Sequence, residues 1–336
     1  MSAGWVFALL MALAFAFTNG VHDAANAIAT LVATRAARPG AAVLLAATCN
    51  ILGPVLLGSA VANTIEGIVT VPASEVISVL GAALTGAVAW NSITWARGLP
   101  SSSGHALLGG LVGAAIAEGG ADAVNWGGFD GIIPVGVIGV AVALTIAPVL
   151  GFVAGLASDR VARRGARRVT RRVRGPVRVG QWAISATLAL SHGANDAQKA
   201  VGLVALILVA GGEISQPTAP LWVEIACGIA LTAGTALGGW PIVRTLGRRI
   251  TLLRPIDALA SEAGSSAVLL GATLVGAPVS TTQIVASSVV GVGGGHRRWR
   301  HVRWRVVRAM LLAWLITVPA SAAFAVVALL PWRLLT

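Results

Sequence analysis

The chain has 336 residues, of which 56% are hydrophobic and only 11% charged, and its mean hydropathy is +0.84. A soluble domain of this length would carry about 25% charged residues, and the sequence lacks the alternating segments of an outer-membrane barrel, so both classes are excluded. The net charge of +12 comes from arginines bunched between apolar runs, which indicates membrane topology and attraction to anionic lipid, with no nucleic-acid partner.

The first half of the chain is predicted to cross the membrane in about five helical segments. The first segment, 4–31, is longer than a bilayer requires, so a tilt or a break is allowed at its polar stretch from Thr18 to Asp23. A short fourth segment follows a Pro-Ser-Ser-Ser turn, where we expect a re-entrant hairpin. The later segments of this half are expected at about 41–62, 76–96, 105–117 and 131–157.

A basic stretch lies at the middle of the chain. Residues 158–178 contain nine arginines and one aspartate, so the positive-inside rule places this loop in the cytoplasm. We therefore expect an N-terminal transmembrane repeat over 1–157, a basic cytoplasmic loop over 158–179, and a C-terminal transmembrane repeat over 180–336.

The second half repeats the plan of the first. Its segments are expected at about 180–210, 220–243, 256–276, 281–293 and 309–331, and its arginine clusters lie at 244–254 and 297–308. Five traverses is an odd number, so the second half must enter the membrane with the opposite orientation. The fold class is thus an all-α polytopic membrane protein of two inverted-topology repeats, whose broken helices and re-entrant hairpins meet at the midplane, as in secondary transporters.

A polar motif occurs once in each half, inside the first long segment. Asp23 and Asn26 of the first copy correspond to Asp196 and Lys199 of the second, and both pairs have a spacing of three residues. Lys199 is the only lysine in the chain, and it follows Asp196 by one helical turn. Ionisable residues inside a membrane are costly, so they mark a functional site by default.

Each half also contains a proline followed by hydroxyl residues. Proline disfavours helix before it, and Ser or Thr caps the helix that follows, so each turn should present a helix N-terminus with unpaired amides. Such an N-terminus attracts anions, and two of them approaching from opposite sides would suit a tetrahedral oxyanion. The hydroxyl residues of these turns are Ser101, Ser102, Ser103, Ser280, Thr281 and Thr282.

Carboxylates beside an anion would repel it unless a cation or a proton intervenes. Asp23 and Asp196 are therefore candidate ligands of Na⁺ or a divalent metal, or carriers of a coupling proton, and Asn195 offers a neutral amide ligand. Glu262 is a further candidate for handling the coupling ion. The motif histidines lack the spacing of a metal site, so we interpret them as supporting or hydrogen-bonded core residues.

These motifs resemble the PiT family of inorganic phosphate transporters, which carries Gly-Ala-Asn-Asp-x-x-Asn-Ala once in each half. Residues 20–27 and 193–200 are the two copies here, and the turns at 100–105 and 278–283 are similar to the family's paired hairpins. The resemblance implies phosphate contacts from Asp23, Asn26, Asn195, Asp196 and the six hydroxyl residues of the turns. Two departures stand out: His22 replaces the first Asn, and Lys199 replaces the last Asn of the second copy.

The resemblance and the residues together lead to one functional expectation. The protein should be a symporter, not an enzyme, that moves inorganic phosphate by alternating access across a bacterial cytoplasmic membrane. Lys199 favours protons over Na⁺ as the coupling ion, with Mg²⁺ or another divalent metal carried as a metal–phosphate complex. A sodium-coupled phosphate symporter and a permease for sulfate or another oxyanion stay as alternatives. No covalently bound cofactor is expected, and a homodimer is left open.

Overall fold

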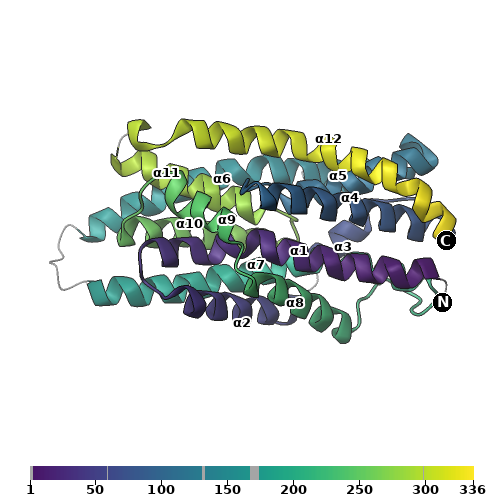
Figure 1. The fold of residues 1–336 in the computed structure, drawn as a ribbon, viewed down its shortest axis with the longest axis horizontal. Helices are drawn as coiled ribbons and strands as arrows, with labels where there is room; N and C mark the ends of the chain where they lie inside the picture. The colour runs from purple at the N-terminus through teal and green to yellow at the C-terminus, as the bar shows by residue number, and fades with distance from the viewer. Residues whose placement is uncertain (1–2, 59, 131–132, 167–173, 298) are drawn as a thin grey trace.

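The computed structural model describes residues 3–58, 60–130, 133–166, 174–297 and 299–336. The helices lie side by side along the long axis of the molecule, and both termini lie at the same end (Figure 1). The elements are α1 (Ala3–Ala33), α2 (Pro39–Leu57), α3 (Ala60–Glu66), α4 (Val76–Ala96), α5 (Ser103–Gly119), η1 (Ala121–Ala123), β1 (Gly128–Asp130), β2 (Ile133–Val135), α6 (Gly136–Ala166), α7 (Arg174–Ala210), α8 (Leu221–Ala236), α9 (Trp240–Arg244), η3 (Thr245–Arg249), α10 (Pro255–Leu274), α11 (Thr281–Arg297), η4 (Trp299–His301) and α12 (Trp304–Leu335).

The predicted all-α membrane architecture is confirmed. Six described helices are long and apolar enough to cross a membrane, and α8 with α9 and η3 forms a seventh candidate that bends by 59°. Helices α5 and α11 have 17 residues each, fewer than the roughly 20 that a full traverse requires. Together with α4 and α10, which precede them, they form the two expected hairpins. The antiparallel pair β1–β2 was not expected from the sequence.

The two halves have the same order of elements, so α1 to α6 correspond to α7 to α12. The pairing between halves is extensive, because α6 packs on α10 and α11 while α12 packs on α4 and α5. Helices α1 and α2 pack on α8 and α7 in the same crosswise manner. Each repeat therefore completes its partner, and neither buries its apolar surface alone.

The breaks in the helices lie elsewhere than the sequence suggested. Helices α1 and α7 run without interruption through both polar motifs, so the break allowed at Thr18 to Asp23 is wrong. The motif side chains find partners on neighbouring helices, and the backbone needs no opening there. The second span of each repeat breaks instead, between α2 and α3 and between α8 and α9. Gly58 and Gly238 stand at these breaks with φ of +79° and +84°, conformations that glycine adopts without strain.

The two ends of the helix bundle differ in charge. At one end Arg163 pairs with Asp257, Arg178 donates to the carbonyl of Ala36, and Arg303 donates to the carbonyl of Arg248. These contacts bring the arginine clusters of both repeats together, and we call this the arginine-rich end. The predicted basic loop 158–179 is helical at its described edges, whereas residues 167–173 lie outside the described residues.

Candidate functional site

The helices α5 and α11 begin in the same way, head to head. Ser102 accepts a hydrogen bond from the backbone N–H of His105 at 3.2 Å, and Ser280 accepts one from the N–H of Gln283 at 3.4 Å. Both serines are buried N-caps, as the sequence predicted for the hydroxyl turns. The side chains of His105 and Gln283 meet at 3.5 Å, so the two helix starts face one another.

The first motif aspartate is buried and surrounded by donors. Asp23 accepts a hydrogen bond from Ser103 of α5 at 3.2 Å and another from Thr282 of α11. The Nδ1 atom of His22 lies 3.1 Å from the same carboxylate. One carboxylate on α1 thus joins both re-entrant helices, which come from different repeats.

The second motif aspartate lies in a corresponding position on α7. Asp196 accepts a hydrogen bond from Thr281 at 2.8 Å, and the Nε2 atom of His192 lies 3.0 Å from the same oxygen. Lys199 pairs with the other oxygen of Asp196 and donates to the carbonyl of Val279 at 2.8 Å. This lysine is only 1% exposed, and a buried ammonium requires such partners.

The two halves of the site differ in the sizes of two facing side chains. Where the second repeat has Lys199, the first has Asn26, whose amide donates to Thr282 at 3.1 Å. Across from Lys199 lies Gly104, the counterpart of Thr282, and a Cβ there would stand 3.7 Å from the lysine Nζ. The long cation faces the residue without a side chain, and the short amide faces the threonine.

The motif asparagines each leave a free acceptor. The amide of Asn195 donates to Ala277 O at 3.1 Å and to Thr273 Oγ1 at 3.3 Å. The Oδ1 atoms of Asn26 and Asn195 are buried and have no hydrogen-bond partner among the described residues. A buried amide oxygen without a donor is well suited to ligate a cation or to accept from a protonated substrate.

Three ligand groups are close enough to share a metal ion. Asp23, His192 and Asp196 each offer one atom, and these atoms lie within 4.8 Å of one another. All three side chains are buried. Carboxylate oxygens with one imidazole suit a divalent cation, so the predicted ligands Asp23 and Asp196 are brought together and His192 joins them.

Two predicted site residues lie one layer away from this cluster. The hydroxyl of Ser101 contacts His22 Nε2 at 3.1 Å and Thr94 at 2.8 Å, so it supports the histidine beside Asp23. Glu262 of α10 accepts from Thr30, one turn beyond Asn26 on α1. Its second oxygen is buried without a partner among the described residues.

Two residues of α7 have contacts that were not predicted: His192, expected only as a supporting residue, joins the ligand group, and Gln198 links α7 to α3. His192 stands four residues before Asp196, and this spacing on one helix face was the available signal for its contact with the carboxylate. Gln198 faces the other way, where its oxygen accepts from the N–H of Val61 at 2.8 Å and its amide donates to the carbonyl of Gly58. No local pattern identifies this long-range link between the site helix and the break before α3.

Comparison with known proteins identifies the family. The model of the phosphate transporter family matches residues 19–173 and 158–325. A probable low-affinity inorganic phosphate transporter of Bacillus subtilis (strain 168) is 38% identical over 330 residues, covering 96% of this chain and 95% of that protein. A protein of the same description from Rhizobium meliloti (strain 1021) is 40% identical over 329 residues, covering 96% of each chain.

A solved structure titled "The sodium-dependent phosphate transporter" has the same fold. It superposes with a TM-score of 0.85 at 24% identity and covers 99% of this chain and 100% of the other. The matched family model spans both polar motifs and both hydroxyl turns, and the two relatives match over nearly their full length. The chain belongs to the phosphate transporter family, and the resemblance inferred from the paired motifs is confirmed.

Proposed function

We propose that the protein is a symporter that binds inorganic phosphate between the starts of α5 and α11 and moves it by alternating access. The observation that carries this proposal is the convergence of two capped helix N-termini on a buried lysine and three hydroxyls. Ser103, Thr281 and Thr282 supply the hydroxyls, and Lys199 supplies the fixed positive charge. Helix N-termini and an ammonium together favour a tetrahedral anion.

The charges of the site support coupling to a cation. Asp23 and Asp196 carry two negative charges, and Lys199 neutralises only one of them. A phosphate entering beside the remaining carboxylate needs a proton or a cation to offset the repulsion. Asp23 has an imidazole 3.1 Å away on His22, so the pair can hold a proton at the site. We therefore favour protons as the coupling ion.

A divalent metal fits the same site as cargo. The atoms of Asp23, His192 and Asp196 lie close enough to hold Mg²⁺ or a similar ion, and phosphate oxygens would complete its coordination. We propose that phosphate travels as its metal complex, which reduces the charge that must cross the membrane.

Sodium coupling is the alternative that a specific observation favours. The solved structure of the same fold is titled as a sodium-dependent transporter, and the free oxygens of Asn26 and Asn195 are suitable sodium ligands. Glu262, linked through Thr30 to the turn beyond Asn26, is the proposed second carrier of the coupling ion. A sulfate permease is the remaining alternative, because helix N-termini discriminate little between tetrahedral anions.

The proposal includes an orientation of the protein in the membrane. By the positive-inside rule we place the arginine-rich end in the cytoplasm of a bacterial cell, with the segment 158–179 as the boundary between the repeats 1–157 and 180–336. The arginine-poor end, where Arg333 pairs with Glu118, then faces outward.

Uptake of radiolabelled phosphate into proteoliposomes tests the proposal. We expect an imposed inward proton gradient to drive uptake, and we expect Mg²⁺ removal by a chelator to reduce it. Asp196→Asn and Lys199→Ala should abolish uptake while the protein still inserts, and Ser92→Ala on the exposed face of α4 is the matched control.

Each alternative predicts a different result. Uptake driven by a sodium gradient alone would show that Lys199 does not select protons. Competition of phosphate uptake by excess sulfate would favour the wider oxyanion permease. Unchanged uptake in both site variants would contradict the site assignment itself.

A further inference from the structure

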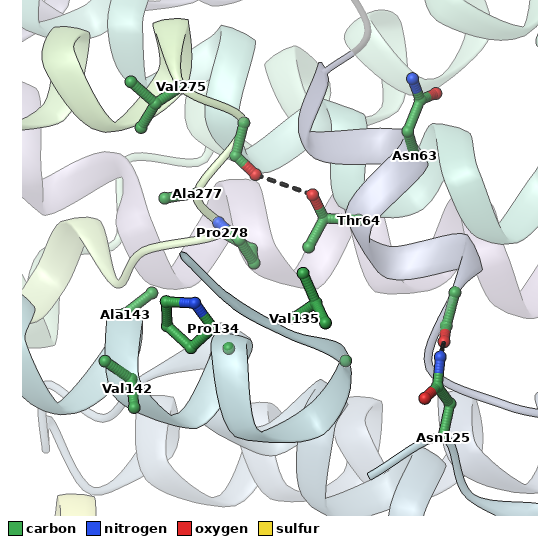
Figure 2. A pocket seen from close by; sticks show the side chains of 14 residues that line it. Asn63, Thr64, Asn125, Pro134, Val135, Val142, Ala143, Val275, Ala277 and Pro278 are labelled. Carbon is green, nitrogen blue, oxygen red and sulfur yellow. Dashed lines mark hydrogen bonds between the residues drawn. The ribbon is translucent and has the colours of Figure 1, made fainter. Parts of the chain in front are cut away.

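A cavity of about 640 Å³ lies beside the site, on the arginine-poor side of the molecule. The cavity is lined by α3 with Thr64, by the turn 275–278 before α11, by β2, by the first turns of α6 with Val142 and Ala143, and by the loop residue Asn125. Figure 2 shows Pro134, Val135 and Pro278 around the open space between α6 and this turn. At about 30 Å³ per molecule, the cavity has room for roughly 20 waters.

One stretch of backbone contacts both this cavity and the proposed phosphate site. Ala277 lines the cavity, and its carbonyl accepts the amide of Asn195 at 3.1 Å. Two residues later the carbonyl of Val279 accepts Lys199 at 2.8 Å. The segment 276–279 therefore has the cavity on one side and the site on the other, and we call it the outer wall.

Thr64 holds the outer wall in place. Its hydroxyl donates to the carbonyl of Gly276 at 2.9 Å, the contact drawn as a dashed line in Figure 2. Gly276 has a φ of +71°, where a side chain is strained, and a Cβ there would stand 3.0 Å from the carbonyl of Ala60. Gln198 fixes the other end of α3 to the site helix. Helix α3 thus connects the outer wall to α7.

The opposite repeat has the same threonine contact. Thr245 donates to the carbonyl of Gly98 at 3.0 Å, and Gly98 also has a positive φ, +63°. There the indole of Trp314 donates to the carbonyl of Pro100 at 2.8 Å, and Trp314 lines a smaller cavity of about 190 Å³. Beside Pro278 the lining residues are the smaller Val142 and Ala143. The two threonine contacts are equivalent, and the one at Thr64 borders the cavity of about 640 Å³.

We propose that this cavity is the vestibule through which phosphate reaches the site from the arginine-poor face, and that Thr64 is the positioning residue that keeps its outer wall closed. The inference rests on the proposed function for the nature of the cargo. Release of the Thr64 hydrogen bond lets the segment 276–279 move toward α6, into the cavity, and exposes Lys199 and Asn195.

Thiol labelling tests the vestibule without depending on transport. In a full-length background with Cys49 and Cys227 replaced by alanine, we introduce Ala143→Cys as a reporter in the vestibule and Ser280→Cys as a reporter behind the outer wall. A membrane-impermeant methanethiosulfonate added at the arginine-poor face should modify the cysteine at 143 rapidly and the one at 280 slowly. Equal protection of both, or modification of 143 only from the arginine-rich face, would overturn the vestibule.

Labelling rates of Thr64 variants test the role of this residue separately. Thr64→Val removes the hydroxyl and should speed modification at 280 about fivefold, the equivalent of about 1 kcal/mol for one hydrogen bond. Thr64→Ser keeps the hydroxyl and should restore the slow rate, and Thr245→Val at the other face should leave labelling from this side unchanged. An unchanged rate in folded Thr64→Val would refute the role of Thr64. Failure of phosphate uptake with the expected labelling would instead count against the proposed function.

Discussion

The site depends on a few side chains whose charges cannot be considered separately. Asp196 and Lys199 are both nearly unexposed, and each is the other's main electrostatic partner. A buried ion pair contributes little net stability, but removing one partner leaves an unpaired charge and costs about 3–5 kcal/mol. The spacing of three residues places both side chains on one face of α7. The carbonyl of Val279 was not predictable, because it depends on the path of a distant turn.

A double-variant comparison separates stability from transport at this pair. Lys199→Met should lower the free energy of unfolding by about 3–5 kcal/mol, because Asp196 stays charged and buried. Adding Asp196→Asn should recover most of this loss, while phosphate uptake stays absent in both variants. Thermal unfolding in detergent measures the first effect and proteoliposome uptake the second. Equal melting temperatures for the single and the double variant would contradict the pairing.

The helices match the predicted apolar segments closely in length, but their breaks lie where the sequence signals are weaker. The predicted segment 76–96 coincides with α4, because a continuous apolar run with no competing signal determines both its ends. The polar motif in α1 allows a break by its sequence, yet α5 and α11 supply hydrogen bonds to its side chains, and only the assembled fold shows this. Prediction fails where partners are far apart in sequence.

Close approach of helices from different repeats depends on glycine. A Cβ at Gly20 of α1 would collide with the carbonyl of Leu231 on α8, and a Cβ at Gly234 of α8 would collide with the carbonyl of Phe17 on α1. These reciprocal contacts let the two backbones touch. Small residues of this kind are the usual basis of helix packing in membranes.

Alanine substitution tests this packing directly. Gly20→Ala should destabilise the protein by about 1–3 kcal/mol, because backbone atoms must move to admit the methyl group. Gly271→Ala on α10 is the matched control: a Cβ there meets nothing within 4 Å, and alanine favours helix by about 0.5–1 kcal/mol. The yield of folded protein and its melting temperature in detergent should fall only for the first variant. A lower melting temperature for Gly271→Ala would show that the effect is not steric.

At the scale of the whole molecule the two repeats are held together by exchange of their last helices. Helix α6 of the first repeat lies on α10 and α11, and α12 of the second lies on α4 and α5. The duplicated motifs made the inverted repeat predictable from the sequence. The packing of α6 and α12 on the opposite repeats was not predictable, because the order of the elements along the chain is the same with or without it.

Each exchanged helix is fastened by an arginine near its end, and the two contacts differ in burial. Arg163 of α6 bridges Asp159 and Asp257 with distances of 2.7 Å, and both carboxylates are less than 5% exposed. Arg333 of α12 pairs with Glu118 at 2.9 Å, but its own side chain is 45% exposed. Water screens the second pair, so its contribution to stability should be small.

The difference in burial predicts unequal effects of removing the two arginines. Arg163→Ala leaves two buried carboxylates without a cation, and we expect a loss of about 2 kcal/mol, less than for a fully buried pair because Arg163 is a quarter exposed. Arg333→Ala should be close to neutral, as should Arg160→Ala on the exposed face of α6. The three arginine variants are compared by their melting temperatures in detergent, at low and at high salt. If Arg163→Ala lost as little stability as Arg333→Ala, the packing of α6 on the second repeat would not depend on this ion bridge. Apolar packing on α10 and α11 alone would then join the repeats.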